Sequence, residues 1–241
     1  MRVMPEKGFS LIESLMSLSL FLIILLSSLE FFASARSHFL KLKDEQETNQ
    51  AAYSGLDKMR EDILQGGLGL LMPARLGVLE SISKNNGTLI IYTKEKDLSL
   101  LTDLVSGQTR ILVGSTKKIK KGRELCIFDS NKGEAKPISS VNKDSLVLSS
   151  PLNSSYLKDD TSLILLKKIS LFLDENKHIL RRKVNSSPPQ PLVEDVTSFD
   201  FDYEKSSNLA RLRLGLKANK NKERRYEISV FPKNTALAFR R

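Results

Sequence analysis

The chain has 241 residues, of which 40% are hydrophobic, enough for one globular domain with its own core and an additional segment. Its formal net charge of +10 permits nucleic acid, anionic lipid or an acidic cell-surface polymer as a partner, but requires none of them. The only cysteine is Cys126, which excludes an intramolecular disulfide in any compartment. It lies in a strand-like run, so we expect an inert core residue.

An apolar run of 21 residues covers 9–29 near the start of the chain. As a helix it would be about 31 Å long, which is enough to cross a hydrocarbon core once. One carboxylate, Glu13, interrupts this run. An unpaired carboxylate near the middle of a membrane helix costs about 2.5–3.5 kcal/mol, so Glu13 needs a partner.

A secretory signal peptide is the alternative interpretation of this segment. Arg2 and Lys7 would form its positive region, and the run FASAR at 32–36 offers a cleavage site. However, the apolar run is longer than the hydrophobic region of about 7–15 residues that such peptides carry, and it contains Glu13. Both features favour a retained membrane anchor.

The junction before the apolar run reads KGFSLIES, with Gly8 followed by Phe9, and Glu13 fifth when counted from Phe9. This pattern resembles the class III leader of type IV pilins and of type II secretion pseudopilins. The resemblance implies that residues 1–8 are a leader, that a prepilin peptidase cuts between Gly8 and Phe9, and that the new amino group of Phe9 is methylated. It also implies that Glu13 meets the terminal amine of an adjacent subunit, so that both charges are compensated together.

The helical pattern continues from residue 30 to residue 66, and we expect one helix of about 55 residues. Its polar part, 41–50, would bridge from the membrane to a head domain. The run QGGLG at 65–69 predicts the end of the helix, with Gly66 or Gly67 in the left-handed conformation. Apolar residues then recur at helical spacing on the face expected to contact the head: Ala52, Leu56, Met59 and Ile63.

From about residue 77 to residue 241 the hydrophobic period changes to two, which predicts a mainly β head. Residues 192–204 are expected to form a short helix or turn and then a strand with Phe199, Phe201 and Tyr203 on one face. A closing hairpin follows. The earlier predicted strands lie at 87–94, 109–115, 124–130, 136–141, 144–150 and 162–175. The fold class is therefore α+β, a long N-terminal helix joined to a β-rich head.

The order of elements from residue 120 onward resembles the head of PilW-type minor pilins and of J-type pseudopilins. The chain lacks the cysteine pair of major pilins, and Glu30 stands where many of them have a proline. The resemblance therefore implies a minor pilin that helps to initiate and cap type IV pilus assembly. The alternatives are a J-type pseudopilin of a type II secretion system and a DNA-binding pilin for uptake.

The same resemblance implies partners and a location. The partners would be other minor pilins or pseudopilins, the major pilin, the prepilin peptidase and an inner-membrane assembly platform. The protein would cross the bacterial inner membrane once, with its head outside the cytoplasm, and would later occupy the tip of a pilus or pseudopilus.

The sequence favours a non-catalytic protein without a cofactor or a metal. His38 and His178 lack metal-ligand spacing, and the chain has no nucleophile elbow, P-loop or dinucleotide fingerprint. The pair Asp159 and Asp160 lacks the order of a calcium loop and is interpreted as a solvated turn.

Two basic runs are candidate anion-binding sites. They comprise Lys117, Lys118, Lys120 and Lys121 in the first run and Arg224 and Arg225 in the second. Such side chains can hold phosphates by releasing counterions. Both runs fall at predicted turns and lack interleaved aromatic residues, so solvated lysine and arginine clusters are the favoured interpretation.

Overall fold

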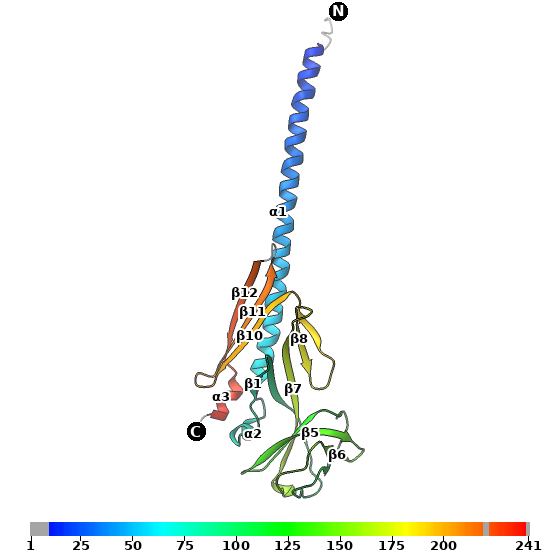
Figure 1. Cartoon of the computed structure of the whole chain (residues 1–241), viewed down its shortest axis with the longest axis vertical. Helices are drawn as coiled ribbons and strands as arrows, with labels where there is room; N and C mark the ends of the chain where they lie inside the picture. Colours follow the sequence, from blue (N-terminus) through cyan, green and yellow to red (C-terminus); the bar gives the residue numbers. More distant parts are fainter. Residues whose placement is uncertain (1–9, 219–221, 240–241) are drawn as a thin grey trace, which may run out of the picture. The chain divides into compact units, whose positions relative to one another are not determined.

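The computed structural model describes residues 10–218 and 222–239, and it has one long N-terminal helix and a β-rich head (Figure 1). The helices are α1 (Leu11–Gln65), α2 (Leu71–Arg75), the 3₁₀ helix η1 (Lys158–Asp160) and α3 (Lys233–Phe239). The strands are β1 (Ile82–Asn85), β2 (Thr88–Leu98), β3 (Arg110–Leu112), β4 (Glu124–Phe128), β5 (Gly133–Val141), β6 (Ser145–Leu148), β7 (Ser162–Asp174), β8 (Ile179–Val184), β9 (Gln190–Val193), β10 (Val196–Glu204), β11 (Leu209–Ala218) and β12 (Lys222–Val230). The expected α+β arrangement is confirmed at this level.

Helix α1 has 55 residues, which matches the length predicted from the sequence. It contains no proline, and its part up to Leu42 is rich in leucine, isoleucine and phenylalanine. Contacts divide the chain into two compact units, 1–48 and 49–241. In the first unit the side chains of residues 11–47 are all exposed, so its helical structure is supported by backbone hydrogen bonds and propensity.

The last turns of α1 belong to the second unit and form the centre of its core. The four apolar residues predicted to face the head are each at most 2% exposed, which confirms that prediction. They join one cluster with side chains of both sheets, among them Leu171, Val193 and Leu212. Gly55 lies on this face, and a Cβ at its position would overlap Cγ2 of Val193 in β9. The helix and the sheet therefore approach too closely for a side chain here.

The larger sheet has nine strands in the order β1-β2-β7-β4-β5-β6-β3, with β8 beside β7 and β9 beside β8. Strand β7 has 13 residues and pairs with β2, β4 and β8, so it connects the two ends of the sheet. Alternate residues of β7 and its neighbours face α1, including Leu89, Ile169 and Leu171. The intervening residues therefore face away from the helix.

Strands β3 to β6 and the loops around them enclose a separate core. Its fully buried side chains include Leu104, Ile111, Leu125, Ile127 and Leu146. The loop between β2 and β3 and the loop after β6 pair through an isolated bridge between Leu104 and Tyr156. We call this part of the head the β3–β6 lobe.

The smaller sheet has the order β10-β11-β12 and packs its apolar face on the core of the second unit (Figure 1). Phe201 pairs with Leu212, and Leu212 with Ile228. Phe201 is buried, while Phe199 and Tyr203 are partly buried against the same cluster, so the predicted alternation is confirmed.

One predicted element differs from the structure. The short helix or turn expected before Phe199 is strand β9 followed by a two-residue turn at Glu194 and Asp195. Pro191, which argues against a regular strand, is accommodated because β9 pairs only with β8 and lies at an edge of the sheet.

The other boundaries agree closely with the sequence patterns. The six predicted strands between 87 and 175 coincide with β2 to β7, and Gly67 has φ 78 just after α1. Four short elements, α2, β1, η1 and α3, were not predicted. Strand β1 has the sequence ISKN and buries only Ile82, so it has no alternating pattern to recognise.

Candidate functional site

The first turn of α1 is closed by a capping box formed by Ser10 and Glu13. The backbone N–H of Ser10 donates to Glu13 Oε2 at 3.1 Å, and the backbone N–H of Glu13 donates to the Ser10 hydroxyl at 3.3 Å. This reciprocal pattern satisfies backbone donors at the helix start, and the carboxylate lies at the positive end of the helix dipole. The S-x-x-E spacing of residues 10–13 is a sequence signal for this cap, whereas our interpretation of Glu13 rested on an adjacent subunit alone.

The segment that follows is long and apolar enough to cross a membrane. Between Glu13 and Glu30 it contains no charged residue. Two of its serine hydroxyls bond within the helix: Ser19 donates to the Leu15 carbonyl at 2.8 Å, and Ser28 donates to the Ile24 carbonyl at 2.7 Å. These two hydroxyls are therefore paired without water, as a hydrocarbon environment requires.

The predicted processing site lies outside the described residues, because these begin at Ser10. Cleavage between Gly8 and Phe9, and methylation of Phe9, therefore stay predictions. Glu13 is described and exposed on the first turn of α1.

The two basic runs lie in different parts of the head, the first in a loop and the second in a strand. Residues 117–121 form a loop between β3 and β4, held by the buried side chain of Ile119 and by Lys96, whose Nζ donates to the Lys117 carbonyl at 3.0 Å. Arg224 and Arg225 belong to β12 of the smaller sheet. Arg225 is already paired with Glu223 at 3.0 Å. The sequence alone does not reveal that the two basic runs lie in different parts of the head.

The remaining candidates from the sequence are metal ligands and the single cysteine. Among the described residues, no group of three or more His, Cys, Asp or Glu side chains could hold a metal ion. Cys126 is 0% exposed in β4, and burial raises the pKa of its thiol to about 12. It is therefore protonated at neutral pH, as expected of a core cysteine.

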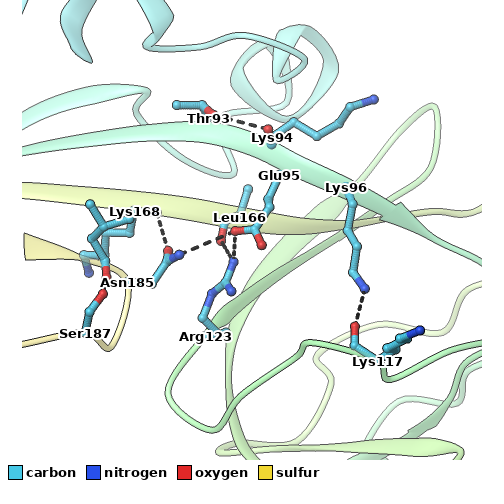
Figure 2. Close-up of polar contacts among 11 residues, drawn as sticks. Thr93, Lys94, Glu95, Lys96, Lys117, Arg123, Leu166, Lys168, Asn185 and Ser187 are labelled. Atoms are coloured by element: carbon cyan, nitrogen blue, oxygen red, sulfur yellow. Dashed lines mark hydrogen bonds and ion pairs between the residues drawn. The ribbon is translucent and has the colours of Figure 1, made fainter. Parts of the chain in front are cut away.

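A polar network on the head joins β2 and β7 to the residue before β4 and the residue after β8 (Figure 2). Arg123 forms an ion pair with Glu95 and donates from Nη2 to the Leu166 carbonyl at 3.0 Å. Asn185 donates to Glu95 Oε2 at 3.4 Å and accepts from the Lys168 N–H at 2.8 Å. The Arg123 side chain is 7% exposed, and its Nε has no hydrogen-bond partner among the described residues.

Next to this network, Lys168 Nζ donates to Glu124 Oε1 at 2.8 Å, and the Tyr92 hydroxyl donates to Glu124 Oε2 at 2.9 Å. Burial raises the pKa of Tyr92. Burial alone would lower the pKa of Lys168, but its hydrogen bond to Glu124 prevails and the pKa is raised. Each oxygen of the Glu124 carboxylate thus accepts from a side chain within the protein.

Comparisons with known proteins identify no family. No protein-family model matches the chain, and no curated protein matches it either. Among solved structures, the Gp54 tailspike of Acinetobacter baumannii bacteriophage AP22, in complex with A. baumannii capsular saccharide, matches with a TM-score of 0.29 and 20% identity over 32% of this chain and 15% of the tailspike. The Pseudomonas phage phi297 tailspike gp61 matches with a TM-score of 0.27 and 13% identity over 31% of this chain and 14% of its own. At these scores the likeness supports no conclusion about fold or function.

Proposed function

We propose that this protein is a membrane-anchored, non-catalytic subunit of a type IV filament system, and that it acts as a minor pilin in an initiating tip complex. The observation that carries the proposal is a capped helix start. Its one carboxylate, Glu13, lies at the beginning of an otherwise uncharged apolar segment. The leader-like sequence KGFSLIES and the β-rich head that follows α1 add support.

In this proposal the helix anchors the subunit in the inner membrane before assembly. The prepilin peptidase would free the amino group of Phe9, and the assembly platform would then bring the subunit to other minor pilins and to the major pilin. Glu13 would exchange part of its contact with the Ser10 N–H for the terminal amine of a neighbouring subunit, and both charges would be compensated where water is scarce.

A J-type pseudopilin of a type II secretion system has the same requirements of anchor, carboxylate and head. The neighbouring genes distinguish the two: a retraction ATPase supports the pilus, and an outer-membrane secretin with exoprotein genes supports secretion. For DNA binding the support is weaker, because the first basic run lies in the loop between β3 and β4 of the larger sheet and the second lies in β12 of the smaller sheet.

The decisive experiment separates the charge of Glu13 from its role in the cap. Glu13→Gln keeps a side chain suited to the capping box but removes the charge, Glu13→Leu removes both, and Ser10→Ala weakens the cap but keeps the charge. If the carboxylate pairs with an amine of an adjacent subunit, both Glu13 variants should lose co-purification with the other subunits, while Ser10→Ala retains it. The lost pairing is worth several kcal/mol.

Two controls accompany the comparison. All three variants should still insert in the membrane and be cut after Gly8, as judged by the mass of the N-terminal peptide, and the head should keep its protease resistance. Normal co-purification of Glu13→Gln together with loss in Ser10→Ala would show that the cap alone matters, and the proposed role of Glu13 in assembly would be wrong.

A further inference from the structure

The face of the larger sheet that points away from α1 carries a polar groove of about 630 Å³. Ile90, Ser170 and Lys183 form one row across β2, β7 and β8, since Ile90 pairs with Ser170 and Ser170 with Lys183. The turn between β1 and β2 and the turn after β8 supply its ends. The polar side chains that line the groove include Asn85, Thr88, Lys168, Ser170, Lys183 and Asn185.

One wall of the groove is held rigidly by Asn185. This residue has φ 53, and its N–H donates to the Lys168 carbonyl at 2.7 Å while its Oδ1 accepts from the Lys168 N–H at 2.8 Å. Figure 2 shows its amide group between Lys168 and the ion pair of Glu95 with Arg123. The wall is therefore ordered before any ligand arrives, which lowers the entropic cost of binding.

The charges of the groove favour an anion. Its one carboxylate, Glu124, forms an ion pair with Lys168 and accepts a hydrogen bond from the Tyr92 hydroxyl, as described above. Lys183 is half-buried and forms no ion pair with any described residue. Gly122 also lines the groove, and the residue before it in the sequence, Lys121, is an exposed cation. A bound anion would thus meet an ammonium group without a carboxylate competitor.

We propose that this groove binds a segment of an acidic polysaccharide. The amides and hydroxyls along the groove can each donate to and accept from sugar hydroxyls, and Lys183 can pair with a uronate carboxylate. Nucleic acid is disfavoured because the described lining contains no aromatic side chain on which a base could stack. The inference goes beyond the proposed function and does not depend on it.

Binding is tested on the full chain in detergent micelles, with oligogalacturonate as the acidic probe. Neutral dextran oligomers and a single-stranded oligonucleotide serve as comparison ligands. We expect saturable binding of oligogalacturonate that weakens with added salt, and weaker or no binding of the other two. Absence of oligogalacturonate binding, equal binding of dextran, or tighter binding of the oligonucleotide would overturn the proposal.

Variants locate the site. Lys183→Gln should weaken oligogalacturonate binding about tenfold, because it removes a charge-assisted hydrogen bond. Lys217→Gln makes the same change in net charge on β11 of the other sheet and should leave binding unchanged. Ser186→Trp should also weaken binding, since Ser186 is exposed at the end of the groove and a large ring there would obstruct it.

A circular dichroism melt of each variant checks that it is folded. If Ser186→Trp is unstable, the comparison of Lys183→Gln with Lys217→Gln tests the site by itself. Equal losses in Lys183→Gln and Lys217→Gln would show a general charge effect, and the groove would then not be the site.

Discussion

Asp62 of α1 and Arg182 of β8 form a two-point ion pair that fastens the end of the helix to the larger sheet. Arg182 donates from Nε to Asp62 Oδ2 at 2.6 Å and from Nη2 to Asp62 Oδ1 at 2.9 Å. Asp62 is 2% exposed, and its hydrogen bonds raise the pKa of Arg182 although burial opposes this. The pair lies beside the apolar stripe of the helix, so either charge would be stranded without the other.

We therefore expect Asp62→Ala to lower the free energy of unfolding of the head by about 3 kcal/mol, because it leaves the Arg182 charge without its partner. Urea unfolding of the full chain in detergent, followed by tyrosine fluorescence, measures this. The double variant Asp62→Leu with Arg182→Met should recover most of the loss, since no buried charge remains. A double variant no more stable than Asp62→Ala would show that the pair contributes more than mutual neutralisation.

Gly55 provides a test of the close approach between α1 and β9. In an open helix, Gly→Ala adds roughly 0.5–1 kcal/mol of stability, but here the new methyl group would overlap Val193. Gly55→Ala should instead lower the free energy of unfolding by about 1–3 kcal/mol through overpacking. In a Val193→Ala background the same change should be stabilising, so the sign of the effect reverses. A stabilising Gly55→Ala in the unmodified chain would contradict the observed packing.

Glu134 of β5 predicts a dependence of the β3–β6 lobe on pH. Its carboxylate accepts from the Asn153 N–H at 3.0 Å and from the Tyr156 hydroxyl at 3.1 Å, and it pairs with Lys136 at 3.1 Å. Burial alone would raise the pKa of Glu134, but these contacts outweigh it and hold the pKa below its ordinary value of 4.5.

A carboxylate with a lowered pKa in the folded state stabilises the fold above its unfolded-state value, and that contribution is lost as the pH falls through the folded-state value. The lobe should accordingly weaken on acidification below about pH 4.5. Hydrogen exchange of the Asn153 and Ser154 amides at pH 6 and pH 4 measures this, with Glu134→Gln as the control that should respond less to pH. Identical responses of the two proteins would rule out Glu134 as the cause.

Processing gives a prediction that requires no assembled filament. The mature protein should begin with an N-methylated Phe9, and its formal charge should fall from +10 to +9, because Arg2, Glu6 and Lys7 are removed. Gly8→Val should remain unprocessed in the membrane, since a β-branched side chain hinders close approach of the peptidase to the backbone. Mass spectrometry of the N-terminal peptide decides both points. A mature N-terminus at Arg36, as a signal peptide would produce, or an intact Met1, would exclude the pilin proposal.

Much of the local structure followed from the sequence, because it is encoded by short-range patterns. The apolar run, the helical spacing of Ala52, Leu56, Met59 and Ile63, and the glycines after Gln65 predicted α1 and its buried face. Alternation of apolar residues predicted β2 to β7. The segment β9 was predicted less well, because an edge strand containing Pro191 depends on its partner β8 more than on its own residues.

The residues of the candidate site were likewise only partly predictable from the sequence. Glu13 was identified from its position in an apolar run, and its cap with Ser10 is a local pattern that the sequence also contains. By contrast, the polar groove is lined by Asn85, Lys168 and Lys183, residues that belong to separate strands. Strand order and register decide which side chains share one face of a sheet, and both result from packing across the whole domain. A sequence read along its length therefore determined the helix, most strands and the carboxylate, while only the tertiary structure decided the pairing of Asp62 with Arg182 and the membership of the groove.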